Sequence, residues 1–395
     1  MATFRADGTP ANPTNRSDFL FGSNNGENIF ARNGADTIFA QDGNDQVYGE
    51  ANDDTLHGAL GDDYLNGGSG DDVLHGEDGN DLLDGSDNDD FLYGGGEDDV
   101  LIGGPGRDYV YGGGEVDIIS YSDGDGNDVV DGGSEFDYLS VFGRDEFGSD
   151  SLLGERYSLT ADGAEFLVQR TSEDPLTIVG AEVEQVEFYT FGGADSIDVG
   201  DLTGTSVESI LIFGGDGTER ITNTGFTSIT AFLEGDGDRF DGGLGADFVY
   251  GGSGADSLDG GEGNDNINGE GESDLLNGGA GNDILFGGDG DDDLVGGSDD
   301  DILFGEGGLD QFVYSIPPFG GGNDTITDFS PGEQVFLGGG ITQAGLDTNA
   351  NGLIDDGDDA AAVIDNNLFI DFAGNNSLSV SNTIFLTFGD SVFIV

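Results

Sequence analysis

Polar and apolar positions of this chain repeat every nine residues over most of its length. An acidic residue recurs at each ninth position across Asp18–Asp117, with Glu27 in one place, and a large apolar residue follows two positions later. After a two-residue insertion the pattern returns at Asp128, and a second block covers Asp238–Asp310. A phase kept over twelve successive units does not arise from composition alone, so internal repeats organise this fold.

Each repeat predicts one short strand and one tight turn. The three residues centred on the apolar position alternate, so the apolar side chain points inward and its neighbours point outward. The other six positions are rich in Gly, Asn and Asp, which form turns, and Gly adopts positive φ at little steric cost. At the fourth position of the repeat, Asn replaces Gly three times and tolerates left-handed geometry. Four other residues fit this position less well: Glu97, Glu115, Glu272 and Asp299.

Two repeats complete one coil of 18 residues, and successive coils should stack about 4.8 Å apart as parallel strands. The expected fold is all-β: a right-handed parallel β-roll, or β-solenoid, of nonapeptide repeats in two blocks, with an irregular β segment between them and a β C-terminal region. The expected domains are a flexible N-terminus at 1–16, roll blocks at 17–141 and 237–314, a linker segment at 142–236 and a C-terminal region at 315–395.

The linker segment at 142–236 loses the nine-residue phase. The run from Tyr157 to Val168, with Asp162-Gly163 at its centre, predicts a β-hairpin. Further strands are expected around Val186 and Ile197. The segment either continues the coil with longer rungs or forms a separate substrate-binding module, and we favour the first.

The net charge of the chain argues against some classes of binding partner. Its 395 residues include 82 Asp and Glu, nine Arg and no Lys, which gives a net charge of −73. Such a charge disfavours a compact state unless cations neutralise it, and it argues against nucleic acid or an anionic membrane as a partner. No apolar run is long enough to span a membrane, and Cys is absent. The unbroken apolar column argues against a disordered acidic spacer.

Stacked coils would place the repeat carboxylates in columns, where neighbouring negative charges repel one another. Ca²⁺ relieves this repulsion because it takes about six to eight oxygen ligands from carboxylates and backbone carbonyls, whereas Mg²⁺ prefers a smaller octahedral shell. We expect calcium between carboxylates 18 residues apart, and metal binding should supply part of the folding free energy. The expected ligands are Asp36, Asp45, Asp54, Asp63, Asp72, Asp81, Asp90, Asp99, Asp108, Asp117, Asp247, Asp256, Asp265, Asp274, Asp283, Asp292 and Asp301.

The repeat unit reads G-G-x-G-x-D-x-U-x, where U is a large apolar residue, as in the run from Gly251 to Asp256. It resembles the RTX (repeats-in-toxin) family, whose nonapeptides form a calcium-binding β-helix. The resemblance implies multiple Ca²⁺ ions as cofactor and a secreted protein, extracellular or at a cell surface. Residues 322–332 are similar to the closing segment of RTX proteins. The run from Asp390 to Val395 is similar to the C-terminal signal of type I secretion substrates, which implies the type I machinery as a partner. The first residues lack the apolar core of a secretory signal peptide, in agreement with that route.

The run from Asp347 to Asp358 resembles an EF-hand calcium loop. Gly352 occupies the sixth position of the loop, as its sharp turn requires. The residues at oxygen-ligand positions are Asp347, Asn349, Asn351, Asp355 and Asp358. Asp358 stands where the family has a bidentate Glu, and the alternative is an ordinary Asn/Gly turn.

No catalytic motif accompanies the repeats: HExxH and GxSxG are absent, and a P-loop requires Lys. The two histidines, His57 and His75, should stack outward on adjacent coils, as a chance surface pair rather than a transition-metal site. Outward aromatic residues either bind an extracellular glycan or surface protein, or stack on one another. We expect a non-enzymatic calcium-binding protein with a structural, cell-surface or adhesive role. The alternative is an extracellular polysaccharide-modifying enzyme or subunit that carries RTX modules.

Overall fold

The computed structural model describes residues 16–122, 125–143, 155–171, 176–314, 322–330 and 333–337, and strands at 361–364, 367–372, 376–380, 385–388 and 391–394. Within these ranges every regular element is a β-strand, as the repeat pattern predicts. The chain divides into two compact units, and the boundary falls within β21 (Ser209–Phe213). Unit 1 comprises residues 1–191 and 200–211, and unit 2 comprises residues 192–199 and 212–395.

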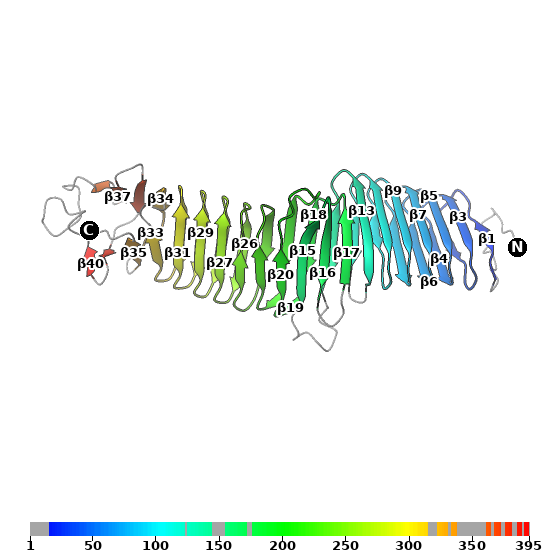
Figure 1. The fold of residues 1–395 in the computed structure, drawn as a ribbon, viewed down its shortest axis with the longest axis horizontal. Coiled ribbons are helices and arrows are strands. Elements are labelled where there is room, and N and C mark those ends of the chain that lie inside the picture. The colour runs from blue at the N-terminus through cyan, green and yellow to red at the C-terminus, as the bar shows by residue number, and fades with distance from the viewer. Residues whose placement is uncertain are drawn as a thin grey trace. The chain divides into compact units, whose positions relative to one another are not determined.

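Unit 1 winds the first block of repeats into two parallel sheets (Figure 1). One sheet contains β1 (Phe19–Phe21), β3 (Thr37–Asp42), β5 (Thr55–Leu60), β7 (Val73–Asp78), β9 (Phe91–Gly96), β11 (Tyr109–Gly114) and β13 (Asn127–Ser134). The other contains β2 (Asn28–Phe30), β4 (Gln46–Ala51), β6 (Tyr64–Ser69), β8 (Leu82–Asp87), β10 (Val100–Ile102), β12 (Ile118–Tyr121) and β14 (Tyr138–Phe142). Leu56 pairs with Leu74, 18 residues later, so the coil of two repeats is confirmed.

The repeat strands are longer than the three residues expected from the sequence. Most cover six residues, because the parallel pairing continues through the Gly positions that follow the apolar residue, as where Gly113 pairs with Gly133. Strand β10 keeps three residues, since Pro105 follows its Gly pair and has no N–H to donate to the ladder.

In most repeats the interior holds one large apolar side chain and an inward-facing glycine two residues later, while Ala31 and Ala40 take the glycine position in the second and third repeats. Leu74 is fully buried, and a Cβ on Gly76 would lie 2.2 Å from Asp81 Oδ2 and 2.6 Å from the carbonyl oxygen of Gly94. The glycine therefore leaves room for the carboxylate that follows it.

Most turns also use left-handed backbone at their second and fourth positions, as at Glu77 (φ 79°) and Gly79 (φ 139°). The four poorly fitting residues at the fourth position keep this geometry, with φ between 69° and 76°: Glu97, Glu115, Glu272 and Asp299. Left-handed backbone is unfavourable for such residues, so the coils on either side hold these turns in place.

The linker segment extends unit 1. The predicted hairpin is confirmed: β15 (Arg156–Asp162) and β16 (Glu165–Arg170) are antiparallel, with Asp162 opposite Glu165. Strand β16 is antiparallel to β17 (Leu176–Ala181), which is parallel to β13. Strand β18 (Gln185–Tyr189) is parallel to β14. Both sheets of the roll therefore continue beyond the repeats, which agrees with the longer rungs that we favoured.

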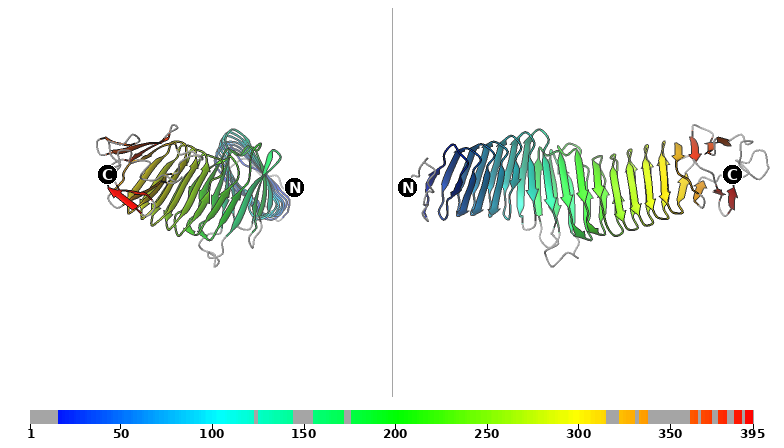
Figure 2. Two further views of the ribbon diagram at one scale, coloured as in Figure 1. Left: turned by 60° about the vertical axis from the view of Figure 1, so that its left-hand side comes forward. Right: turned by 180° about the vertical axis from the view of Figure 1, so that it is seen from behind.

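Unit 2 has the same construction, and its strands follow one another as successive rungs (Figure 2). One sheet contains β20 (Ser196–Val199), β23 (Arg220–Asn223), β25 (Arg239–Asp241), β27 (Ser257–Glu262), β29 (Leu275–Ala280), β31 (Asp293–Ser298), β33 (Gln311–Tyr314) and β35 (Gln334–Leu337). The other contains β24 (Ser228–Phe232), β26 (Phe248–Ser253), β28 (Asn266–Gly271), β30 (Ile284–Asp289), β32 (Ile302–Gly307) and β34 (Asn323–Ile326). A short pair joins β19 (Gly192–Gly193) to β22 (Asp216–Gly217).

The C-terminal region of unit 2 adds strands to both sheets. Strand β34 pairs in parallel with β38 (Asn376–Val380), which forms an antiparallel group with β36 (Ala361–Ile364) and β37 (Asn367–Phe372). Strand β35 pairs in parallel with β39 (Phe385–Phe388), which is antiparallel to β40 (Ser391–Ile394). The β character expected for this region is therefore present.

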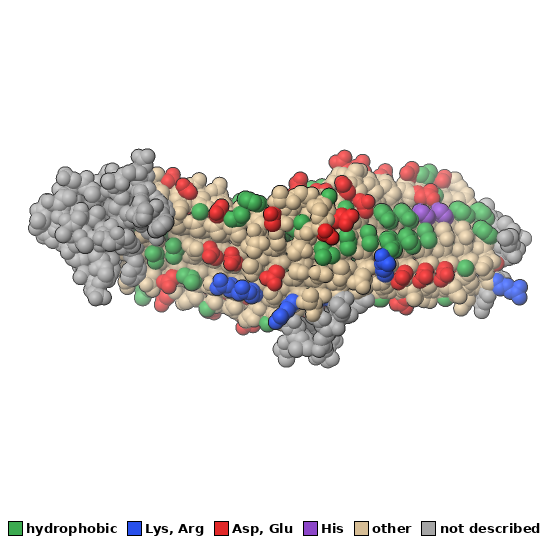
Figure 3. Space-filling model, viewed as in Figure 1, with side chains coloured by type: hydrophobic (Ala, Val, Ile, Leu, Met, Phe, Trp, Pro, Cys, Tyr) green, Lys and Arg blue, Asp and Glu red, His purple; other side chains and the backbone are tan. Residues whose placement is uncertain are grey.

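Outward aromatic residues stack along the first sheet of unit 1 (Figure 3). The column is Phe21, Phe39, His57, His75, Tyr93 and Tyr111. Neighbouring ring centroids lie 4.7–5.3 Å apart with planes within 13° of parallel. Each ring face inside the column is therefore covered by the next ring, as the stacking alternative predicted, and the ring edges remain outward.

The inward glycines give a first prediction. Gly76→Ala should lower the free energy of unfolding of the calcium-loaded protein by about 1–3 kcal/mol or more, since the added methyl group has no room. Gly96→Ala is the control, because a Cβ there meets nothing within 4 Å, and its effect should stay within about 0.5 kcal/mol. Urea unfolding followed by circular dichroism measures both, and equal effects would contradict the packing described.

Candidate metal centre

The repeat carboxylates of each unit line up in two columns, one at each side of the coil. Most of these carboxylates are held through one oxygen, Oδ1, which accepts a hydrogen bond from the backbone N–H of the acidic residue 18 positions earlier, and for Asp247 the donor is the N–H of Ile229. The N–H of Asp54 donates to Asp72 Oδ1 at 2.6 Å, and that of Asp72 donates to Asp90 Oδ1 at 2.7 Å. The turn and its neighbour one coil away therefore fix each side chain.

The structure places all 17 expected repeat ligands in these columns. In unit 1 one column contains Asp36, Asp54, Asp72, Asp90 and Asp108, and the other contains Asp45, Asp63, Asp81, Asp99 and Asp117. In unit 2 they contain Asp256, Asp274 and Asp292, and Asp247, Asp265, Asp283 and Asp301. The EF-hand-like positions Asp347, Asn349, Asn351, Asp355 and Asp358 lie outside the described residues.

Several further acidic residues join the columns without having been among the expected ligands. Asp18, Asp128, Asp137, Asp238 and Asp310 are in phase with the repeats and could have been included on that ground. Asp324 accepts from the N–H of Asp301 at 3.2 Å, although 23 residues separate them. Glu184 accepts from the N–H of Asp137 at 2.9 Å across 47 residues. In the sequence, Asp324 and Glu184 can be recognised as acidic residues two positions before an inward apolar residue. This local pattern is kept where the nine-residue period is lost.

The second carboxylate oxygen, Oδ2, is buried at each of the 17 expected repeat positions and has no hydrogen-bond partner among the described residues. These Asp side chains are at most 4% exposed. Removing an ionised carboxylate from water is costly unless the group is protonated, hydrogen-bonded or bound to a cation. A bound metal ion would neutralise these rows of buried carboxylate oxygens, so the residues present fit a metal site.

Burial has a direct electrostatic consequence. It raises the pKa of Asp54 to about 8, that of Asp72 to about 7 and that of Asp90 to about 9, from an ordinary value of 3.8. Desolvation is the largest cause, the hydrogen bond from the backbone opposes it, and neighbouring carboxylates add to it. In the absence of metal, these groups therefore hold protons near neutral pH.

The ligand set distinguishes between metals. Over the described residues, no group of three or more His, Cys, Asp or Glu side chains converges as a metal site. A cation in the columns would therefore be held by one or two carboxylates and by backbone carbonyls of the turns. An all-oxygen set of this kind suits Ca²⁺, whereas Zn²⁺ and similar ions favour imidazole and thiolate ligands. His57 contacts Glu77, with Nδ1 3.1 Å from Oε1, and otherwise stacks in the aromatic column.

A comparison with protein-family models decides the family. The model of the RTX calcium-binding nonapeptide repeat (4 copies) matches residues 21–56, 48–83, 57–92, 84–119, 122–139, 234–267, 259–294, 268–303 and 286–313. The chain is an RTX hemolysin-type repeat protein. The matched ranges coincide with the two stretches in which the carboxylate columns are continuous, so the calcium-binding motif of the RTX family and the buried Oδ2 atoms are the same feature of this protein.

Other comparisons add little to this RTX assignment. The chain is similar to the crystal structure of the extracellular lipase LipA from Serratia marcescens, with 14% identity over 86% of this chain and a TM-score of 0.19. The aligned part spans 38% of the lipase, and a TM-score this low supports no argument about fold or activity. No curated protein matches the chain.

The raised pKa values predict how the metal-free RTX protein responds to pH. Its folded state holds protons that the unfolded chain releases above the ordinary carboxylate pKa. The stabilisation of the folded state by these bound protons is therefore complete below about pH 4. It is lost as the pH rises towards about 9, the pKa of Asp90 in the folded state. Circular dichroism in metal-free buffers should show more β-structure at about pH 5 than at about pH 8.

Calcium should reverse this dependence, because calcium and protons compete for the same oxygens. The calcium concentration needed for half-maximal folding should fall as the pH rises. A metal-free protein whose β-signal is constant or increases with pH would contradict the buried placement of the carboxylates.

Proposed function

We propose that this RTX protein is secreted and folds on binding Ca²⁺ outside the cell. The supporting observation is the columns of buried Oδ2 atoms, which a protein at neutral pH can neutralise only with protons or bound cations. Each repeat adds only one large apolar residue to the interior, so the hydrophobic core is thin and metal binding contributes to the folding free energy. Calcium-poor cytoplasm would then leave the chain unfolded for export by a type I machinery.

The role that we propose is a structural, cell-surface or adhesive scaffold. Strands β17 and β18 of the segment 142–236, for which a separate substrate-binding module was the alternative, extend the parallel sheets of unit 1, and this favours a scaffold over a polysaccharide-modifying enzyme. No helix among the described residues is long and apolar enough to cross a membrane. A surface protein or extracellular glycan would meet the outward ring edges of the aromatic column, and a glycan-binding screen with calcium-loaded protein tests for an adhesin.

A calcium titration followed by circular dichroism tests the folding proposal. The full chain should be largely disordered with a calcium chelator and gain β-signal at roughly 0.1–1 mM calcium, the range of extracellular calcium modules. Magnesium at the same concentrations is the control and should give little change, since it retains its waters and its octahedral shell. Equal order and heat resistance with and without calcium would refute the proposal.

Substituting a single carboxylate tests the position of the ions. Asp72→Asn keeps the shape of the side chain and removes its charge, so bound calcium should fall by about two ions, from the sites above and below this residue. Asp71→Asn is the matched control, because Asp71 is the exposed neighbour and its Oδ1 accepts only a 3.3 Å hydrogen bond from Asp89. Equilibrium dialysis with metal analysis counts the ions, and an unchanged count in Asp72→Asn would place the calcium elsewhere.

A further inference from the structure

One carboxylate of unit 1 occupies the same niche as the repeat Asp residues although it lies outside the repeats. Glu155 is 4% exposed and stands two positions before the inward Tyr157, as each repeat Asp stands before its apolar residue. A Cβ on Gly143 would lie 2.5 Å from Glu155 Oε2, just as one on Gly112 would lie 2.4 Å from Asp117 Oδ2. Glu155 is therefore an equivalent of a column carboxylate, placed beneath its own glycine.

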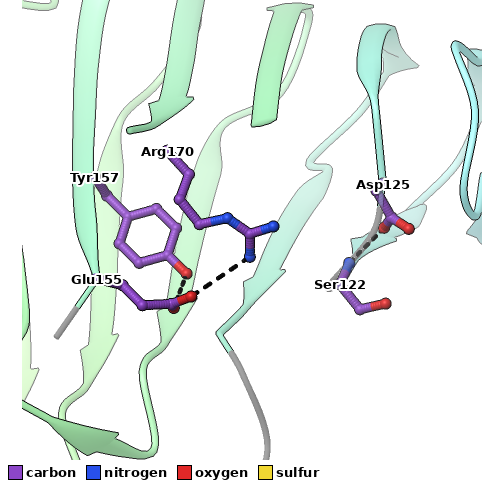
Figure 4. A network of polar contacts seen from close by, with 5 residues as sticks. All are labelled: Ser122, Asp125, Glu155, Tyr157 and Arg170. Carbon is purple, nitrogen blue, oxygen red and sulfur yellow. Dashed lines mark hydrogen bonds and ion pairs between the residues drawn. The ribbon is translucent and has the colours of Figure 1, made fainter. Parts of the chain in front are cut away.

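This carboxylate already has a cation beside it. Arg170 Nη1 lies 3.7 Å from Glu155 Oε1, and the hydroxyl of Tyr157 donates to Glu155 Oε2 (Figure 4). Arg170 is 1% exposed and is the one buried basic residue among those that the structure describes. It stands opposite Tyr157 in the antiparallel pairing of β15 with β16, so the hairpin itself brings the guanidinium to the carboxylate.

The hairpin explains why a side chain, and not a calcium ion, neutralises Glu155. Column carboxylates have a parallel turn one coil away, whose carbonyl oxygens can complete the shell of a calcium ion. Strand β16 carries Arg170 and runs antiparallel to both β15 and β17, so on this side of β15 Glu155 faces a guanidinium and not the parallel turn of a repeat coil. A guanidinium is permanently charged and carries its own donors, so it can neutralise a buried carboxylate without that shell.

The same segment also has the densest apolar interior of unit 1. Among the described residues 155–171 and 176–189, nine large residues point inward: Tyr157, Leu159, Phe166, Val168, Leu176, Ile178, Val183, Val186 and Phe188. A repeat stretch of similar length, 36–71, has four: Ile38, Val47, Leu56 and Leu65. Antiparallel neighbours close in sequence also form contacts at a lower entropic cost than rungs 18 residues apart.

We propose that Arg170 takes the place of a calcium ion at Glu155, so that residues 155–189 form a part of unit 1 that stays ordered without calcium. Repeat coils then add to it through β13 and β14, which pair directly with β17 and β18. The proposal rests on the calcium-dependent folding of the repeats and gives that folding a starting point within unit 1.

Hydrogen–deuterium exchange of the full chain, read by mass spectrometry with chelator and with saturating calcium, tests this arrangement. With chelator, amides of 155–171 and 176–189 should remain protected while those of the repeats at 36–117 exchange as in an unfolded chain. Calcium should then protect the repeats. Arg170→Met leaves the buried carboxyl group of Glu155 without its cation, so it should accelerate exchange of 155–171 and 176–189 in chelator by roughly a hundredfold or more.

Two further variants separate charge from general damage. Arg156→Gln removes the exposed neighbouring arginine and should leave exchange unchanged. Glu155→Gln combined with Arg170→Met removes both charges and should restore protection in chelator, because a neutral pair has no uncompensated charge. Failure of the double variant to recover would mean that Arg170 acts through packing, and would overturn its role as a cation.

The outcomes distinguish this inference from the proposed function. Repeats that stay protected in chelator would refute calcium-dependent folding, and this inference with it. Repeats that exchange freely together with residues 155–189 would leave calcium-dependent folding intact and refute only the calcium-free segment. Protection of 155–189 that Arg170→Met does not change would refute the part assigned to Arg170.

Discussion

The structure depends on a carboxylate oxygen that is buried beneath a glycine. Each repeat turns its Asp side chain inward, uses one oxygen to accept a hydrogen bond from the neighbouring coil, and leaves the other oxygen in the interior. Nothing in the polypeptide of the repeats neutralises that second oxygen, so the fold requires a proton or a metal ion at every turn. The raised pKa values follow directly from this arrangement, and the column carboxylates contribute to the net charge of −73.

The glycines of the nonapeptide repeat have different structural roles. The inward one, such as Gly76, leaves space for the carboxylate, because a Cβ at Gly76 would lie 2.2 Å from Asp81 Oδ2. Those at the second and fourth positions allow the left-handed backbone that reverses the chain twice within one turn. Acidic residues such as Glu97 and Asp299 occupy the fourth position with φ values of 75° and 76°, so this position accepts the strain of a left-handed backbone in a residue with a side chain. The turn positions therefore accept charged residues, whereas the inward position accepts a small one, as Ala31 and Ala40 show.

The repeat period alone was sufficient to predict the coil, the parallel pairing and the columns of Asp residues, because a solenoid converts sequence spacing directly into contacts. It was insufficient wherever the turn length changes. Asp324 and Glu184 enter the columns through connections of 23 and 47 residues, which no period reveals. The strands were predicted too short because the glycines that form turns also take part in the ladder. The contact of Arg170 with Glu155 depends on a hairpin register that spacing between repeats does not define.

The hydrogen bonds from backbone N–H groups to the column carboxylates all run in the same direction along the chain. An Asp side chain accepts from the backbone of the coil before it, so each coil is completed by the one that follows it in the sequence. The last repeat of a column consequently needs an acceptor from outside the repeats, and Glu184 supplies it for Asp137 while Asp324 supplies it for Asp301. The two ends of a roll are therefore not equivalent. Removing coils from the N-terminal side leaves each remaining column N–H with its carboxylate acceptor, whereas removing them from the C-terminal side takes that acceptor from the last column N–H.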